Sequence, residues 1–205
     1  MKGVRRMAKR KVKQVTYDFE NDGVDHINIL AKKGKTLLGR RLSHFAHSQF
    51  IHPYYGAFQS MEGFWHFAST GFQHDFLRNE VGFDAKIKAR ELKLKGNKEH
   101  WYEEFTEDIM VANYLKIIQD QALATMMIES ELPFTHYYLM QDRANPAKLV
   151  MITPREARWM CEGFEKIRAA LKEGSTPEFF EKAQIRYATN IANGRPAHQS
   201  NRTKK

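Results

Sequence analysis

The sequence predicts an α+β fold, a single helix-rich domain with a small β element near its N-terminus. Apolar residues make up 42% of the 205 residues, which is enough for a sizeable core. Strand-like alternation of apolar and polar residues opens the domain over residues 15–29, and apolar residues recur at helical spacing from Ser60 onward. A segment rich in Lys and Arg lies at each end of the chain, which predicts disorder outside the domain.

The first part of the domain combines short strands with a loop. Residues 15–29 predict a strand, a turn and a second strand, because a turn sequence (Asn-Asp-Gly, 21–23) separates two alternating stretches. Residues 32–39 form a basic connection. Residues 42–55 are rich in histidine and aromatic residues and predict an ordered loop rather than a helix. Ser60 is the expected N-cap of the helix that follows.

The rest of the domain is mostly helical. Apolar periodicity and capping signals predict four further helices: residues 83–94, 101–119 (the longest amphipathic segment), 121–129 and 155–171. A last helix is expected to begin at Pro177, with Thr176 as its cap, and to run to about Ala192. Residues 136–140 and 149–152 predict two short strands around a polar turn. The helix over 83–94 has a basic outer face formed by Lys86, Lys88, Arg90 and Lys93.

The two ends carry most of the net charge of +9. Residues 1–13 contain seven Lys and Arg and residues 193–205 contain four, with no acidic residue in either. The segment between them, residues 14–192, keeps 22 basic and 24 acidic residues and is the predicted domain. Basic ends bind polyanions in a salt-dependent way, so we expect nonspecific contact with DNA or RNA. The alternative is that these charges only aid solubility. The arm residues assigned to such contact are Lys9, Arg10, Lys11 and Lys13.

Composition excludes several classes of protein. The single cysteine, Cys161, rules out an internal disulfide framework and a cysteine-based zinc site. No apolar run approaches the ~18 residues of a membrane span, and none follows the basic N-terminus, so we expect a cytoplasmic protein without a signal peptide or membrane contact. There is no Gly-rich phosphate loop. His44, His47 and His52 lie close in sequence but are more simply hydrogen-bonded wall residues than metal ligands, so we expect no metal and no cofactor.

Two residues are candidates for chemistry. Glu62 lies in the first turn of an aromatic-rich helix, with His66 on the same face at i+4. A carboxylate desolvated by large apolar side chains is in the setting that a general acid/base needs, but a first-turn Glu can also simply cap its own helix. Trp101 opens the longest helical segment. It is either a core residue or a ring on which a base can stack.

Three blocks, in order, resemble the NADAR family, also called YbiA-like N-glycosidases. Residues 42–45 (Leu-Ser-His-Phe) are similar to its Leu-Ser-Asn-Phe element, and residues 60–65 (Ser-Met-Glu-Gly-Phe-Trp) to its Ser/Thr-x-Glu-His-x-Phe/Tyr helix start. Residues 100–112 resemble its tryptophan-containing helix. The resemblance covers about residues 25–130.

The resemblance implies a YbiA/NADAR-like fold and hydrolysis of an N-glycosidic bond. The implied substrates are a phosphorylated ribosylamino-pyrimidine or ADP-ribose on guanine in nucleic acid, and neither a metal nor a cofactor is implied. Glu62 takes the family's acid/base position and Trp101 its ring-stacking position. The other residues expected to contact the substrate are Phe45, Ser43, His44 and His66.

The chain departs from the family pattern at four places. The family's Asn is His44, its His after the Glu is Gly63, and a later Lys is Ser69. Its Asp-x-Trp-Gly segment is missing, since residues 134–138 read Phe-Thr-His-Tyr-Tyr. Two other functions therefore stay open. One is a non-catalytic nucleic-acid-binding protein with basic tails and an aromatic pocket, and the other is an interaction protein in which Glu62 is only a cap.

Overall fold

The computed structural model describes residues 17–96 and 102–198. Trp101 and the arm residues Lys9, Arg10, Lys11 and Lys13 lie outside the described residues. The α-helices are α1 (Leu37–Leu42), α2 (Met61–Ser69), α3 (Gly82–Leu94), α4 (Phe105–Ile118), α5 (Gln121–Glu129), α6 (Ala157–Glu173) and α7 (Glu178–Ala192). The 3-10 helices are η1 (Phe19–Asn21) and η2 (Asp75–Asn79). The strands are β1 (Ile27–Asn28), β2 (Phe50–His52), β3 (Gly56–Phe58), β4 (Phe134–Thr135), β5 (Tyr138–Gln141) and β6 (Leu149–Ile152).

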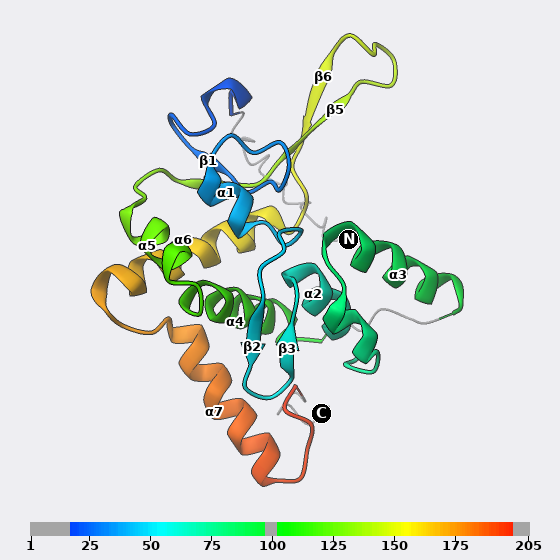
Figure 1. The fold of residues 1–205 in the computed structure, drawn as a ribbon, viewed down its shortest axis with the longest axis vertical. Helices are drawn as coiled ribbons and strands as arrows, with labels where there is room; N and C mark the ends of the chain where they lie inside the picture. The colour runs from blue at the N-terminus through cyan, green and yellow to red at the C-terminus, as the bar shows by residue number, and fades with distance from the viewer. Residues whose placement is uncertain (1–16, 97–101, 199–205) are drawn as a thin grey trace, which may run out of the picture.

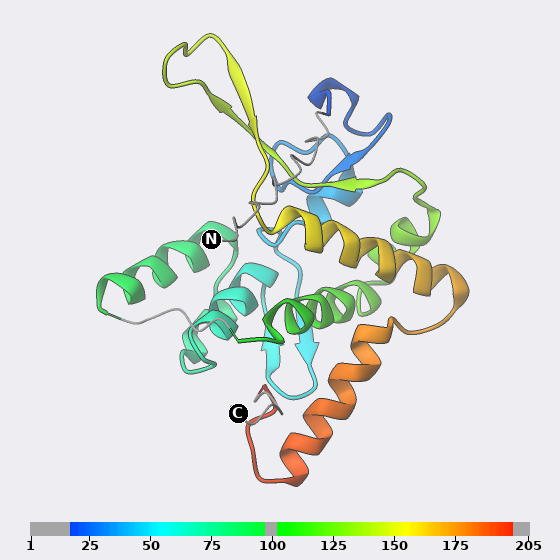
Figure 2. The ribbon, with the colours of Figure 1, turned by 180° about the vertical axis from the view of Figure 1, so that it is seen from behind.

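Helix α4 lies at the centre of the fold (Figure 1) and is buried on nearly all sides, as an all-round apolar helix must be. It contacts α2, α5, α6, α7 and β2. Its side chains are shared between two apolar clusters. Phe105, Ile109 and Leu115 pack with α2, β2, β3 and α7, and Met110 and Ile117 pack with α1, α5, β4 and α6. Figure 2 shows α6 running over α4 on the side turned away in Figure 1.

Three two-stranded sheets surround this helical core in the described residues. Strands β1 and β4 pair in parallel, with Ile27 opposite Phe134, whereas β2–β3 and β5–β6 are antiparallel hairpins. The β5–β6 hairpin projects from the body (Figure 1). The prediction of a single helix-rich α+β domain is therefore confirmed.

Several predicted elements are confirmed where local signals are strong. Helix α2 begins after Ser60, whose hydroxyl accepts a hydrogen bond from the Gly63 amide at 3.0 Å. Helices α3 and α5 occupy the predicted ranges. The strand-like runs at 136–140 and 149–152 form the β5–β6 hairpin. Residues 43–55 are not helical, although β2 lies within them. Leu42 ends α1, a helix that begins inside the predicted basic connection over residues 32–39.

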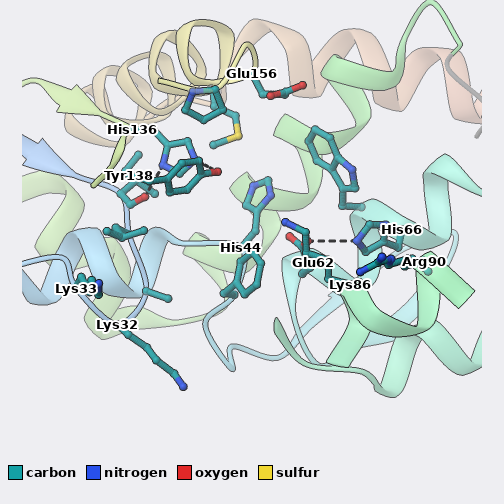
Figure 3. Close-up of a pocket in the computed structure, with 18 of the residues that line it drawn as sticks. Lys32, Lys33, His44, Glu62, His66, Lys86, Arg90, His136, Tyr138 and Glu156 are labelled. Carbon is teal, nitrogen blue, oxygen red and sulfur yellow. Dashed lines mark hydrogen bonds and ion pairs between the residues drawn. The ribbon is translucent and has the colours of Figure 1, made fainter. Parts of the chain in front are cut away.

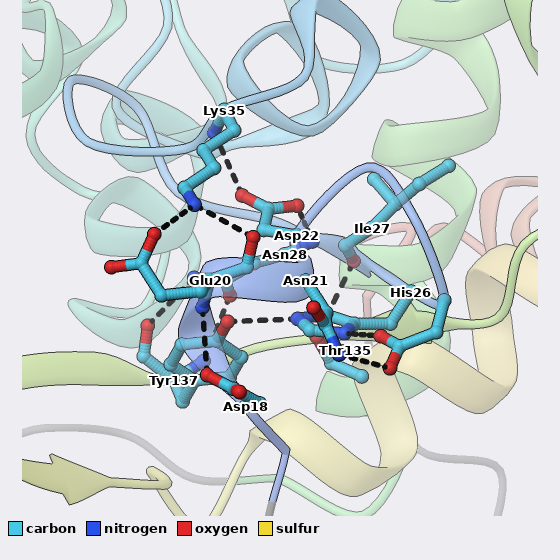
Figure 4. Close-up of polar contacts among 11 residues, drawn as sticks. Asp18, Glu20, Asn21, Asp22, His26, Ile27, Asn28, Lys35, Thr135 and Tyr137 are labelled. Carbon is cyan, nitrogen blue, oxygen red and sulfur yellow. Dashed lines mark hydrogen bonds and ion pairs between the residues drawn. The ribbon is translucent and has the colours of Figure 1, made fainter.

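The predicted N-terminal hairpin is wrong. Of its first strand the structure describes only residues 17–19, where no strand forms and η1 begins, because the Asp18 carboxylate accepts a hydrogen bond from the Glu20 amide and closes the turn. Strand β1 pairs with β4, more than a hundred residues away. The Asp22 carboxylate stabilises this arrangement by accepting from the amides of Asn28 (2.9 Å) and Lys35 (2.7 Å), as Figure 4 shows.

Two helix starts also differ from the predictions. Helix α4 begins at Phe105 rather than 101, and its 14 residues make it shorter than α6, which has 17. Helix α7 begins at Glu178, one residue after Pro177. Thr176 does not cap it, because its hydroxyl donates to the Glu181 carboxylate at 2.6 Å.

The packed body extends past the predicted boundary at residue 192. Ala197 is buried, and its carbonyl accepts a hydrogen bond from the Asn190 amide group at 2.7 Å. The ring of His198 stacks on Phe72, with centroids 4.0 Å apart. Residues 193–198 therefore belong to the body rather than to a free tail.

Candidate active site

A cavity of about 630 Å³ opens between α2, α3, the loop at residues 29–33, the base of β5 and the start of α6 (Figure 3). It brings together four of the predicted site residues. The cavity is lined by Phe45, His44, Glu62 and His66, together with Trp65, His136, Tyr138, Glu156 and a set of basic side chains. Residues from six separate parts of the chain thus converge on one space.

Glu62 points into this cavity rather than capping its helix. The Ser60 hydroxyl occupies the cap position of α2, and no backbone amide of the described residues donates to the Glu62 carboxylate. Glu62 is only 8% exposed. Its Oε1 lies 3.2 Å from His66 Nε2, one turn along the helix, within ion-pair distance but without hydrogen-bond geometry. This arrangement favours a chemical role for Glu62 over the capping role.

His44 is held beside Glu62 as a neutral ring. Its carbonyl accepts a hydrogen bond from the Glu62 amide at 3.0 Å. The Asn113 Nδ2 group lies 3.0 Å from the Ile109 carbonyl, to which it donates, and 3.1 Å from His44 Nε2. His44 Nε2 is therefore the acceptor, and the ring proton is on Nδ1. Burial and the nearby Lys116 lower the pKa of His44 to about 3, so the ring is uncharged at neutral pH.

A buried lysine fixes the segment that carries His44. The Lys116 Nζ donates to the carbonyls of Arg41 and Leu42, both at 3.0 Å, where α1 ends. Ser43 follows, and its hydroxyl accepts from the Phe45 amide at 3.3 Å. Ser43 does not line the cavity, so it shapes the turn that presents Phe45 rather than contacting a ligand there.

Lys116→Met is expected to flatten the pH dependence of stability. Burial lowers the pKa of Lys116 from 10.5 to about 7. Above that pH the folded chain releases a proton that the unfolded chain keeps, so the free energy of unfolding rises with pH, by at most ~1.4 kcal/mol per unit. Urea unfolding between about pH 7 and about pH 9 measures this slope. The exposed Lys88→Met serves as the control, and an equal slope in Lys116→Met and the parent would contradict the assignment.

Aromatic side chains form one wall of the cavity. Trp65 stacks on Trp159 with centroids 6.0 Å apart and meets Phe105 edge-on at 5.0 Å. The Phe45 ring lies 5.5 Å from the Lys86 Nζ. Trp65 reads in the sequence as part of an apolar helix stripe, and only the packing of α2 against α4 and α6 turns it toward the cavity.

The opposite wall was not predicted. His136 and Tyr138 line it, and Glu156 lies at the start of α6 (Figure 3). The His136 Nδ1 is 2.7 Å from the Ile29 carbonyl, and its Nε2 is 3.2 Å from the Tyr138 hydroxyl. His136 and Tyr138 both lie in residues 134–138, the segment that differs from the NADAR Asp-x-Trp-Gly pattern. This difference is the one feature of the sequence that could have pointed to the wall.

Basic side chains rim the mouth. One set comes from the loop before α1 and the other from α3, where three of the four residues of the predicted basic face line the cavity. The rim residues are Lys32, Lys33, Lys86, Arg90 and Lys93. Within the described residues, Lys32, Lys33 and Arg90 form no ion pair, whereas Lys88 on the same helix pairs with Glu80 and lies away from the cavity. The unpaired cations make the mouth attractive to anions.

Gly63 and Ser69, two positions where the sequence differs from the NADAR pattern, are both buried in α2. A side chain at Gly63 would place its Cβ 2.5 Å from the Leu77 carbonyl, so α2 and η2 approach too closely for any other residue. Ser69 is buried, and its hydroxyl donates to the His66 carbonyl within the helix at 3.2 Å.

The three clustered histidines have separate surroundings. His44 contacts Asn113, His47 contacts the Gln59 side chain at 3.1 Å, and His52 is buried among aromatic rings. In the described part of the chain, no group of three His, Cys, Asp or Glu side chains could hold a metal ion.

Comparisons with known proteins give no relative. No family model matches the chain, and neither a curated protein nor a solved structure is significantly similar to it. Across residues 17–96 and 102–198, no helix is both long enough and apolar enough to cross a membrane.

Proposed function

We propose that the protein is an N-glycosidase of YbiA/NADAR-like fold that hydrolyses the bond between a ribose carbon and a base or amine. The observation that carries this proposal is the Glu62 carboxylate, held beside His66 in a cavity with aromatic walls and a cationic rim. The resemblance supplies the substrate classes, a phosphorylated ribosylamino-pyrimidine or ADP-ribose on guanine in nucleic acid. Both carry the anionic groups that the rim favours.

In the proposed reaction, positive charge develops on the sugar as the C–N bond breaks. Glu62 orients a water molecule and accepts its proton while the water oxygen bonds to the anomeric carbon. The electron pair of the C–N bond goes to the leaving nitrogen, which takes up a proton. Burial keeps His44 neutral and makes it a hydrogen-bond donor through Nδ1 rather than an acid. His66, next to Glu62, is then the residue that protonates the leaving nitrogen.

The aromatic wall suits the leaving base. Phe45 and Trp65 both line the cavity and offer ring surface on which a base can stack. A stacked base is worth ~1–3 kcal/mol. Trp101 stays a prediction for the same purpose.

The alternative is a protein that binds nucleic acid without cleaving it. The rim cations serve either function. Glu62 favours catalysis over binding alone. A buried carboxylate repels a phosphate in the same cavity, so it would weaken the affinity of a protein that only binds nucleic acid. A general base beside a reacting carbon gives the same carboxylate a use.

Rim charges are expected to act on substrate affinity more than on turnover. Arg90→Gln or Lys33→Gln removes one exposed ion pair between the rim and a substrate phosphate, which is worth ~0.5–1 kcal/mol. Its loss should raise KM for a phosphorylated substrate about two- to fivefold and leave kcat nearly unchanged. Lys88→Gln is the matched control on the same helix, since Lys88 pairs with Glu80. Steady-state kinetics at two salt concentrations measures the effect. A fall in kcat without a change in KM would contradict this role for the rim.

Mass spectrometry of a substrate panel tests the function. The protein is incubated with an oligonucleotide that carries ADP-ribose on guanine, and separately with a phosphorylated ribosylamino-pyrimidine. Release of the free base or amine from one of them is the expected result. Binding of both without release would support the non-catalytic alternative instead.

A further inference from the structure

A directed chain of hydrogen bonds ends in the cavity. It runs from the Ile29 carbonyl through both ring nitrogens of His136 to the Tyr138 hydroxyl, with distances of 2.7 Å and 3.2 Å. A carbonyl oxygen only accepts hydrogen bonds, so His136 Nδ1 carries a proton and donates it to Ile29. Burial lowers the pKa of His136, so the ring is neutral at neutral pH and Nε2 is an acceptor. The Tyr138 hydroxyl proton is thereby committed to His136.

Because the hydrogen bonds run in this direction, the lone pairs of the Tyr138 hydroxyl oxygen can accept a hydrogen bond from a ligand. Tyr138 is 38% exposed and lines the cavity, across His44 from Glu62 (Figure 3). Because its proton is engaged, its oxygen meets a ligand as an acceptor. A phosphate oxygen has no proton to give it at neutral pH, whereas a sugar hydroxyl does.

The position of Tyr138 is fixed by the network beneath it. Asn28 brackets the backbone of Tyr137, since its Nδ2 donates to the Tyr137 carbonyl (3.2 Å) and its Oδ1 accepts from the Tyr137 amide (3.1 Å). The Tyr137 hydroxyl is 2.8 Å from His26 Nε2 (Figure 4). Together with the β1–β4 pairing, these contacts hold the segment that carries His136 and Tyr138 on the cavity wall.

We propose that Tyr138, with His136 as its positioning residue, is a specificity-determining residue that accepts a hydrogen bond from a ribose hydroxyl of the substrate. This inference rests on the proposed function for the identity of the sugar. These contacts would fix the orientation of the substrate in the cavity. A ribose hydroxyl donates to Tyr138, the anionic groups contact the cationic rim, and the anomeric carbon faces Glu62.

The first test is the protonation of His136. Nitrogen-15 NMR of the full chain at neutral pH should show the proton on Nδ1, and Tyr138→Phe should shift the Nε2 resonance because its donor is lost. A proton on Nε2 would overturn the proposal, since Tyr138 would then be free to act as a donor.

The second test measures binding of ribose 5-phosphate and its 2-deoxy and 3-deoxy forms by calorimetry. One deoxy form should bind the parent protein about three- to tenfold more weakly, the equivalent of one neutral hydrogen bond. Tyr138→Phe should bind ribose 5-phosphate more weakly by the same factor and should lose the preference. Tyr114→Phe, buried in α4 away from the cavity, is the matched control.

The outcomes separate this inference from the proposed function. A deoxy preference that persists in Tyr138→Phe would overturn the role of Tyr138. No binding of ribose 5-phosphate by the parent protein would contradict both. The expected binding pattern in a protein that cleaves no ribosylated substrate would refute the hydrolysis and leave the assignment of Tyr138 intact.

Discussion

Glu62→Gln is expected to abolish turnover and to leave the fold intact. The change keeps the size of the side chain and its contact with His66 but removes the base, which typically contributes ~10²–10⁴-fold to the rate. Ser60 still caps α2, so the helix keeps its start. Single-turnover kinetics measures the loss directly.

The matched control for this change is Glu91→Gln on α3, an exposed acid that does not line the cavity. It should retain the parent rate, and both variants should melt near the parent temperature. If Glu62→Gln cleaved its substrate at nearly the parent rate, Glu62 would have no part in the reaction.

Arg186→Met should cause the largest loss of stability. Arg186 contacts the carboxylates of Asp108, which is fully buried, and of Glu107 at 3.0 Å. The hydroxyls of Tyr102 and Tyr187 also donate to Asp108. Removing one member of a buried pair leaves the other charge uncompensated and costs ~3–5 kcal/mol. Chemical unfolding measures this cost.

A double variant separates charge from packing. Arg186→Met combined with Asp108→Asn removes both charges, so it should recover most of the stability lost by Arg186→Met alone. A double variant as unstable as the sum of the two single changes would mean that packing, and not the uncompensated charge, explains the loss.

Local signals predicted the parts of the fold that local forces decide. Ser60 caps α2 because a hydroxyl at that position reaches the Gly63 amide whatever lies around it. The sequence predicts a neighbouring partner for the strand that contains β1, yet β1 pairs with β4, because no local pattern encodes a contact across more than a hundred residues. Asp108 lies in the first turn of α4, where an acid is expected to interact only with the helix dipole. Its partner Arg186 lies 78 residues away, and this contact makes Asp108 a member of a buried ion pair.

The residues of the site also divide into those that local spacing predicts and those that only tertiary packing brings together. Glu62 and His66 share a helix face by their spacing, so the sequence alone brought them together. Trp65 reads as core because an apolar stripe does not show which side chain meets a cavity. Tyr138 and the α3 cations join the site only through tertiary packing, which brings separate segments to one mouth.

Hydrolysis in water labelled with oxygen-18 tests the central claim most directly. The parent protein and Glu62→Gln are incubated with each ribosylated substrate, and the released sugar is analysed by mass spectrometry. Attack of water on the anomeric carbon predicts one oxygen-18 atom in the sugar product of the parent and none in the base, with no product from Glu62→Gln. An unlabelled sugar, a label in the phosphate, or equal product from both proteins would contradict the account.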